Sequence, residues 1–231
     1  MRGALVAFVL AIVALFVSVP ALCATVTVVR FAGTVNPGSA DYIDWAIKQA
    51  TLSGSECLVI EMDTPGGLVA STRTIVQSIL NAPLPVVVYV SPAGAHAGSA
   101  GVMITLAAHL AAMAPGTNIG AAHPVAAGGE KIDEELKKKI TNDTIAFVKA
   151  IAQKRKRNVK WAIEAVEQSA SVTASEAVKL GVVDLLADST RELLEKIDGR
   201  TVQLDGREVV LKTKDAQIAR LEPSIKHKLL M

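Results

Sequence analysis

Short runs of β-branched and apolar residues, separated by helical segments, constrain the fold of this chain more than any other feature. The runs cover residues 25–31, 57–62, 85–90 and 182–186. Helical patterns lie between them, among others up to residue 50, over 69–81 and over 132–157. Strands that alternate with helices and are apolar throughout are typical of a parallel sheet covered on both faces. The sequence therefore predicts an α/β fold with a largely parallel sheet.

The composition agrees with one large α/β domain. Of the 231 residues 51% are hydrophobic but only 3% are aromatic, so the core must consist of Ala, Val, Leu and Ile. The net charge of +2 gives no electrostatic reason to expect a nucleic-acid partner. Two cysteines, Cys23 and Cys57, cannot form a disulfide framework, and Cys57 is expected to be a small buried hydrophobe.

The N-terminus has the pattern of a targeting segment. Arg2 precedes an uninterrupted apolar run over residues 4–19, and small residues follow up to Ala24. This order is typical of a secretory signal peptide, with cleavage after Ala21 or Ala24; an uncleaved membrane anchor is the alternative. We therefore expect residues 1–24 to be a signal peptide and residues 25–231 to form one domain outside the cytoplasm.

Ser99 is the first candidate for chemistry. It lies in a stretch of small residues, 93–101 (AGAHAGSAG), between the strand at 85–90 and an apolar helical run. A serine at the start of a helix has free amide N–H groups beside it, which suits an activated nucleophile. The alternative interpretation is a serine that only caps the helix.

A glycine loop is the second candidate. Residues 63–67 (DTPGG) follow the strand at 57–62, at the end of a parallel sheet where ligands bind. Gly66 and Gly67 expose backbone N–H groups that could form an oxyanion hole. The alternative is a tight turn between a strand and a helix.

Lysines and histidines are the candidates for a base. On the helix at 132–157 the apolar stripe excludes Lys138, which falls opposite it, but leaves Lys137 and Lys139 at its two edges. A lysine at such an edge can be partly desolvated and act as a base. His123 competes, whereas His96 and His109 are weaker candidates. The basic run at 154–157 is expected to be a solvated helix end, and no metal or nucleotide motif is present.

Several segments together resemble the NfeD family of membrane-bound ClpP-class serine proteases. They are residues 63–67, 98–101 (GSAG), 113–124 (MAPGTNIGAAHP), 173–177 (TASEA) and 180–184 (LGVVD). The resemblance implies the ClpP/crotonase-like spiral of ββα units. It also implies peptide hydrolysis by a dyad of Ser99 and Lys139 without a cofactor, with Gly67 and Ala100 forming the oxyanion hole and Gly66 shaping the turn.

The same resemblance implies a substrate and an assembly. The family cleaves hydrophobic peptide segments, including those of stomatin-like membrane proteins, and ClpP-like units assemble into dimers or larger oligomers. His123 lies where ClpP has its histidine, but the acid position falls near Ser169, so we favour Lys139 as the base. A non-catalytic scaffold for a membrane partner and a crotonase-type acyl-CoA enzyme are the alternatives; the signal peptide argues against the second.

Overall fold

A parallel sheet of six strands forms the centre of the computed structural model, which describes residues 24–125 and 133–230. Of the predicted signal peptide, only Ala24 lies within the described residues. Residue 132, where the predicted long helix starts, lies outside them. In spatial order the sheet consists of β11 (Gln217–Arg220), β1 (Thr25–Ala32), β2 (Leu58–Asp63), β3 (Val86–Val90), β5 (Leu110–Met113) and β8 (Leu185–Leu186). All neighbouring pairs in it are parallel, as the sequence predicts.

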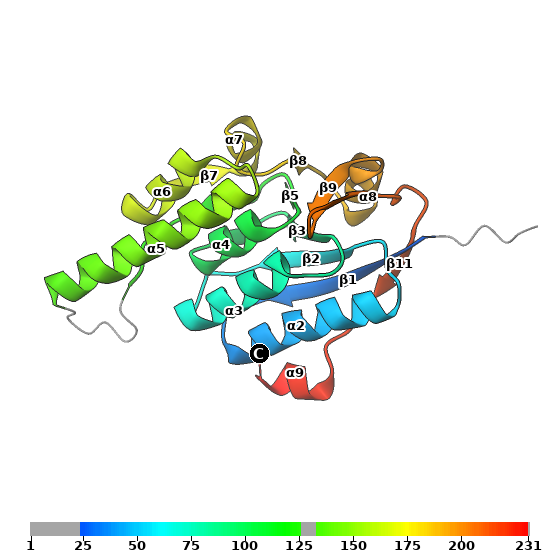
Figure 1. The fold of residues 1–231 in the computed structure, drawn as a ribbon, viewed down its shortest axis with the longest axis horizontal. Coiled ribbons are helices and arrows are strands. Elements are labelled where there is room, and N and C mark those ends of the chain that lie inside the picture. Colours follow the sequence, from blue (N-terminus) through cyan, green and yellow to red (C-terminus); the bar gives the residue numbers. More distant parts are fainter. Residues whose placement is uncertain (1–23, 126–132, 231) are drawn as a thin grey trace, which may run out of the picture.

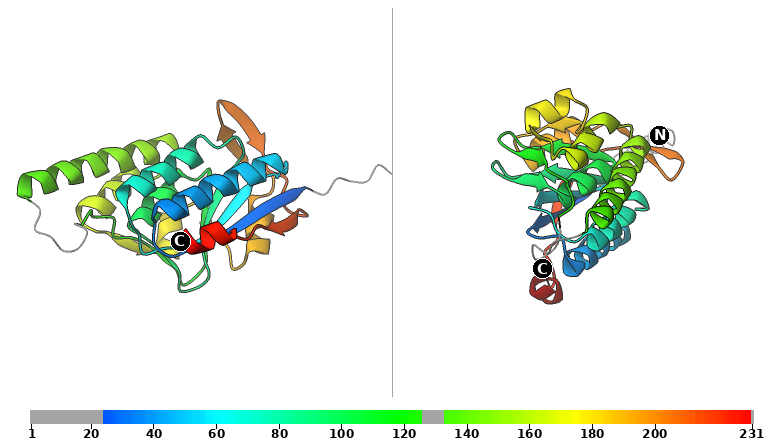
Figure 2. Two further views of the ribbon diagram at one scale, coloured as in Figure 1. Left: turned by 90° about the horizontal axis from the view of Figure 1, so that it is seen from below. Right: turned by 90° about the vertical axis from the view of Figure 1, so that its left-hand side faces the viewer.

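Helices cover both faces of this sheet (Figures 1 and 2). In chain order they are α2 (Pro37–Leu52), α3 (Val69–Leu80), α4 (Ala100–Ala107), α5 (Glu134–Lys154), α6 (Val159–Glu167), α7 (Ala174–Lys179), α8 (Thr190–Ile197) and α9 (Ile225–Leu230). Helices α2 to α6 share one core with the sheet, and α8 closes the second core on the opposite face. Successive side chains of a strand point to opposite faces of the sheet, so Ile60 packs into the first core and Val59 into the second.

Two small sheets complete the fold. A hairpin pairs β9 (Thr201–Leu204) with β10 (Arg207–Val210) through a turn at Asp205–Gly206, a residue pair typical of tight hairpins. The other consists of β4 (His96–Gly98), β6 (Asn118–Gly120) and β7 (Ser171–Thr173). The sequence does not predict β4 or β6 as strands, because three residues that include a glycine carry no periodic pattern. This sheet places β4 directly before Ser99.

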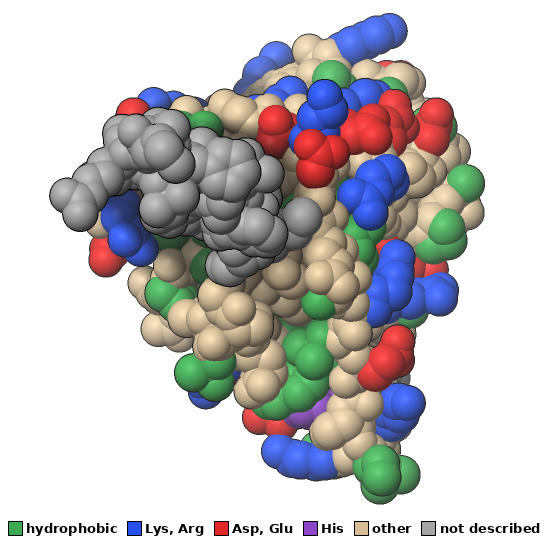
Figure 3. Space-filling model, turned by 90° about the vertical axis from the view of Figure 1, so that its right-hand side faces the viewer, with side chains coloured by type: hydrophobic (Ala, Val, Ile, Leu, Met, Phe, Trp, Pro, Cys, Tyr) green, Lys and Arg blue, Asp and Glu red, His purple; other side chains and the backbone are tan. Residues whose placement is uncertain are grey.

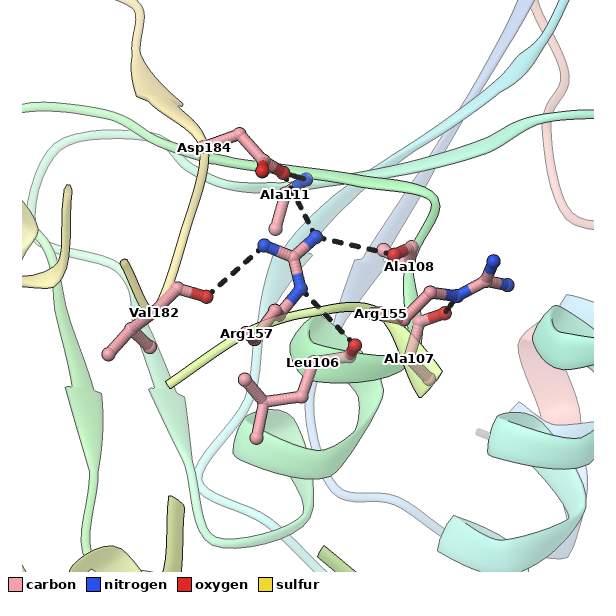
Figure 4. Close-up of polar contacts among 8 residues, drawn as sticks. All are labelled: Leu106, Ala107, Ala108, Ala111, Arg155, Arg157, Val182 and Asp184. Carbon is pink, nitrogen blue, oxygen red and sulfur yellow. Dashed lines mark hydrogen bonds and ion pairs between the residues drawn. The ribbon is translucent and has the colours of Figure 1, made fainter. Parts of the chain in front are cut away.

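Arg157 fixes the C-terminal end of α4 (Figure 4). Its guanidinium donates to the carbonyl oxygens of Leu106 and Ala108, each at 3.3 Å, and pairs with Asp184 at 2.9 Å. The Arg157 side chain is only 3% exposed, so the expectation that the whole basic run is solvated is wrong for this residue. A cation at this position also complements the negative end of the helix dipole of α4, whose other end adjoins Ser99.

The described surface carries charges of both signs. On the face drawn in Figure 3, acidic and basic side chains are interspersed, with hydrophobic side chains between them. Among the residues that the structure describes, no helix is both long and apolar enough to span a membrane.

Candidate active site

Ser99 occupies a strained position between β4 and α4. Its backbone has φ 48° and ψ −106°, a region that residues with a side chain rarely adopt and that costs on the order of 1–3 kcal/mol. The Ser99 N–H donates to the carbonyl of Gly120 at 3.0 Å, and this bond holds the turn in place. Although Ser99 is the N-cap residue of α4, its side chain makes no capping hydrogen bond. The hydroxyl is therefore not used as a helix cap, and the nucleophile interpretation is favoured over the capping one.

The glycine loop lies against this serine. A Cβ atom built on Gly66 would be 2.6 Å from Cβ and 3.2 Å from Oγ of Ser99, closer than a side chain allows. Gly66 also has a φ of 115°, which favours glycine by itself. Gly66 and Ser99, which are 33 positions apart in the sequence, thus come into contact because Gly66 has no side chain.

Backbone pairing orients the N–H groups of the loop. The carbonyl of Gly66 accepts a hydrogen bond from the Val35 N–H at 2.8 Å. In a trans peptide the following N–H points the opposite way, so the N–H of Gly67 is turned away from Val35. Ala100 begins α4, and the N–H groups of a first helical turn have no carbonyl partner within the helix. The two donors predicted for an oxyanion hole therefore come from the two segments that border Ser99.

Small residues also let α4 pack closely on this loop. A Cβ atom on Gly101 would be 2.9 Å from Cγ2 of Thr64 and 3.2 Å from Cβ of Ala97. Thr64 in turn pairs with β4 through a parallel bridge to Ala97. The run of small residues around Ser99 thus brings three segments into contact.

Lys139 lies on the N-terminal part of α5, at the end of the molecule where β1 also ends (Figure 1). This part of the helix projects beyond the sheet, and Lys137, Lys138 and Lys139 are all exposed. Leu136, which the sequence places on the apolar stripe, is 49% exposed, so the stripe is buried only further along the helix. Among the described residues, no hydrogen bond joins Lys139 to Ser99, and the expected desolvation of the lysine is not seen in the single chain.

His123 is held by a backbone carbonyl and not by an acid. Its Nδ1 lies 2.9 Å from the carbonyl oxygen of Val166 on α6, and the side chain is half-buried. A carbonyl can fix the orientation of an imidazole, but it stabilises the imidazolium less than a carboxylate does. The structure therefore leaves His123 as the alternative base.

His109 is not suited to act as a base. Burial, together with the nearby Arg155 guanidinium, lowers the pKa of His109 to about 3. Its Nδ1 accepts a hydrogen bond from the Val86 N–H at 3.1 Å, and its Nε2 lies 3.1 Å from Arg155. Both ring nitrogens are thus occupied in a structural role.

The structure also brings together a pair that the sequence did not single out. Asp63, the last residue of β2, lies beside His96, the first residue of β4, and both adjoin the glycine loop and Ser99. A separation of 33 residues gives no sequence signal for such a pair. Asp63 and His96 come together because the bridge between Thr64 and Ala97 aligns the two segments that carry them.

Comparison with protein families matches residues 25–221 to the family described as NfeD1b, N-terminal domain. Two curated proteins are similar in sequence. The membrane-bound protease PH1510 of Pyrococcus horikoshii is 39% identical over 225 residues, which is 95% of this chain and 51% of that protein. The membrane protein NfeD1b of Bacillus subtilis is 28% identical over 193 residues, 78% of this chain and 43% of that protein. The chain thus spans about half the length of these relatives.

Solved structures are similar over most of the chain. A 1510-N membrane-bound stomatin-specific protease, in a lysine-to-alanine variant complexed with a substrate peptide, has a TM-score of 0.84 at 37% identity, covering 90% of this chain and 96% of that one. A serine-to-alanine variant has a TM-score of 0.82 at 38% identity, with 87% and 99% covered. ClpP1 of Listeria monocytogenes has a TM-score of 0.53 at 20% identity, covering 70% and 91%, and supports the fold alone. The ClpP-like fold expected from the sequence is confirmed.

Proposed function

This chain belongs to the NfeD1b N-terminal domain family, and from that premise we propose that it is a serine endopeptidase. The observation that carries the proposal is the strained backbone of Ser99, with a hydroxyl that does not cap α4 and a glycine loop against it. Strain of this kind at a half-buried serine turn is typical of a nucleophile held at a sharp strand-to-helix corner. The sequence similarity to a membrane-bound protease supports the same activity.

The proposed mechanism is a Ser–Lys dyad. Neutral Lys139 accepts the proton of the Ser99 hydroxyl while Oγ attacks the carbonyl carbon of the scissile peptide bond. The N–H groups of Gly67 and Ala100 stabilise the resulting oxyanion, and Gly66 keeps the turn close to the serine. The lysine then gives its proton to the leaving amine. In the second half of the reaction Lys139 takes a proton from water as the water oxygen attacks the acyl carbonyl, and the proton then passes to Oγ of Ser99 as it leaves. Lys139 belongs to the N-terminal part of α5, which lies toward the end of the molecule where β1 ends (Figure 1), and this placement supports the role.

The dyad requires Lys139 to lose both its exposure and its charge. Taking a cationic side chain out of water disfavours its charged form, so burial against another surface would supply the neutral amine. A second copy of the chain that covers the projecting part of α5 would provide such a surface, and we propose a homodimer or higher oligomer for this reason.

The proposed substrate is a hydrophobic peptide segment of a stomatin-like membrane protein. Two exposed apolar side chains border the glycine loop: Leu68 and Val69 follow it at 50% and 48% exposure. Adjacent exposed apolar side chains beside a site favour an apolar segment as ligand. The similar 1510-N protease is described as stomatin-specific and has been solved with a substrate peptide, which supports this class.

The proposed location is the extracytoplasmic side, with membrane association. It depends on the N-terminal segment 1–24, interpreted as a signal peptide, and on residues 25–231 as one protease domain. The match of the family to residues 25–221 supports this division, and both curated relatives are described as membrane proteins.

Cleavage of a hydrophobic peptide by single variants tests the proposal. We expect Ser99→Ala and Lys139→Ala each to lower kcat by a factor of at least about 100, because each removes a group that acts in the transition state. Lys138→Ala is the matched control and should retain activity within about twofold, since its side chain is equally exposed one position away. Loss of activity in His123→Ala with full activity in Lys139→Ala would move the base role to the histidine.

A covalent probe separates the peptidase from the alternatives. A serine-directed phosphonate should label the wild-type chain at Ser99 and fail to label Ser99→Ala. Absence of labelling in the wild type, together with tight binding of a membrane partner, would favour the scaffold.

A further inference from the structure

Asp63 fixes the position of His96 beside the catalytic serine. One carboxylate oxygen of Asp63 accepts a hydrogen bond from the His96 backbone N–H at 3.1 Å. The same oxygen lies 3.5 Å from the ring atom Nδ1. A carboxylate that faces Nδ1 favours the tautomer with the proton on that nitrogen, which leaves Nε2 as an acceptor.

The ring of His96 covers the residue directly before Ser99. A Cβ atom built on Gly98 would be 2.9 Å from Cδ2 and 3.0 Å from Nε2 of His96, and 3.0 Å from the carbonyl oxygen of Pro65. The Nε2 edge of the ring therefore packs against Gly98, on the side where the carbonyl oxygen of Pro65 also approaches this residue. A side chain at Gly98 would displace the ring from this position.

Exposure distinguishes this pair from a purely structural one. The second Asp–His contact of the described residues joins Asp41 to His227 at 3.4 Å, and the His227 side chain is 5% exposed between the rings of Tyr42 and Trp45. The side chains of His96 and Asp63 are 40% and 41% exposed. An oriented imidazole at the mouth of a site retains a nitrogen that can contact a ligand, whereas His227 is packed into the protein.

We propose that His96, held by Asp63, is a substrate-positioning residue that accepts a hydrogen bond from the peptide next to the scissile bond. The inference rests on the proposed peptidase function. The oxyanion donors at Gly67 and Ala100 are N–H groups and can pair only with substrate carbonyls. Substrate N–H groups need acceptors, and an extended peptide advances only about 3.3 Å per residue. A peptide with its carbonyl at Ser99 therefore brings a neighbouring N–H group near the ring that covers Gly98.

Peptide binding in a Ser99→Ala background tests this role without cleavage. The probe is a fluorescein-labelled hydrophobic peptide followed by anisotropy. His96→Phe, which retains a ring but has no acceptor, should weaken Kd about five- to tenfold, the value of one hydrogen bond. His96→Gln restores an acceptor and should bind within about twofold of the parent. Asp63→Asn should fall between them, and Asp41→Asn, at the other Asp–His contact, should have no effect.

The outcomes separate this inference from the proposed function. Equal affinity of His96→Phe and its parent, equally weak binding of His96→Gln and His96→Phe, or no peptide binding by the parent would overturn the positioning role. A drop in Tm of more than about 4 °C in His96→Phe, with equal weakening by Asp41→Asn, would assign the effect to folding and overturn it as well. A wild-type chain that never cleaves the peptide, while His96→Phe still weakens binding, would refute the peptidase and leave His96 as a ligand contact.

Discussion

Replacing Arg157 with methionine should destabilise the protein strongly, although the residue belongs to a basic run that looks like a solvated helix end. Its guanidinium is 3% exposed and donates to three backbone carbonyls, those of Leu106, Ala108 and Val182, besides pairing with Asp184. Methionine fills a similar volume but donates no hydrogen bond. The three carbonyls would lose a donor that water cannot easily replace, and the carboxylate of Asp184 would lose its charged partner.

The magnitude follows from the burial of the pair. Removing one partner of a buried ion pair costs about 3–5 kcal/mol. Asp184 is 30% exposed and keeps its hydrogen bond from the Ala111 N–H at 2.7 Å, so the carboxylate can recover some solvation. We therefore expect the lower end, about 3 kcal/mol, in the free energy of unfolding. For a domain of this size that loss lowers Tm by about 6–12 °C.

Thermal unfolding followed by circular dichroism, with urea titration for the free energy, measures this effect. Lys154→Met is the matched control, because Lys154 lies in the same run but is exposed, and should stay within about 0.5 kcal/mol of wild type. Adding Asp184→Asn to Arg157→Met should recover part of the loss by removing the unpaired charge. A loss below about 1 kcal/mol in Arg157→Met, or an equal loss in Lys154→Met, would refute the assignment of Arg157 as a buried clamp.

Two further predictions concern the glycine loop and the edge of the sheet. Gly66→Ala should abolish phosphonate labelling of Ser99, because its Cβ would lie 2.6 Å from Cβ of the serine; Gly54→Ala, also at positive φ but with open space around it, should label normally at a stability cost of about 1 kcal/mol. Burial tends to raise the pKa of Glu61, but its hydrogen bonds, above all from Arg220, outweigh burial and hold that pKa below its usual value of 4.5. The stabilisation by Glu61 is thus present above that pH and is lost as the pH falls through the folded-state pKa. Between about pH 5 and 3 the Tm of the wild type should therefore fall more steeply than the Tm of Glu61→Gln. Parallel curves of Tm against pH would contradict this prediction.

Features with a local physical cause could be predicted from the sequence. Strands β1, β2, β3 and β8 of the central sheet follow from runs of apolar and β-branched residues, and the sheet is buried on both faces as that pattern requires. The capping box of Thr173 and Glu176 and the Asp205–Gly206 turn involve only neighbours in the chain, so their residue patterns alone are enough to indicate them. Cys57 is fully buried, as its place in an apolar run indicates.

Features that depend on distant partners could not be predicted. Strand β11 pairs with β1 across about 190 residues, between Thr25 and Gln217 among others, and its four residues carry no signal of their own. The same holds for β4 and β6, which form strands only through their partners: β4 pairs with β6, and β6 also pairs with β7. In the sequence, Arg157 is one of four consecutive basic residues, 154–157. Only in the folded chain do carbonyl oxygens surround its guanidinium.

The candidate site divides in the same way. The sequence by itself determined the nucleophile candidate and the glycine loop, because a serine among small residues and two adjacent glycines after a strand are local patterns. Only the tertiary structure decided that Gly66 touches Ser99, that the serine is strained and does not cap its helix, and that Asp63 holds His96 beside it. The reason is that strain, close approach and the orientation of a side chain arise from contacts between segments that the sequence keeps apart.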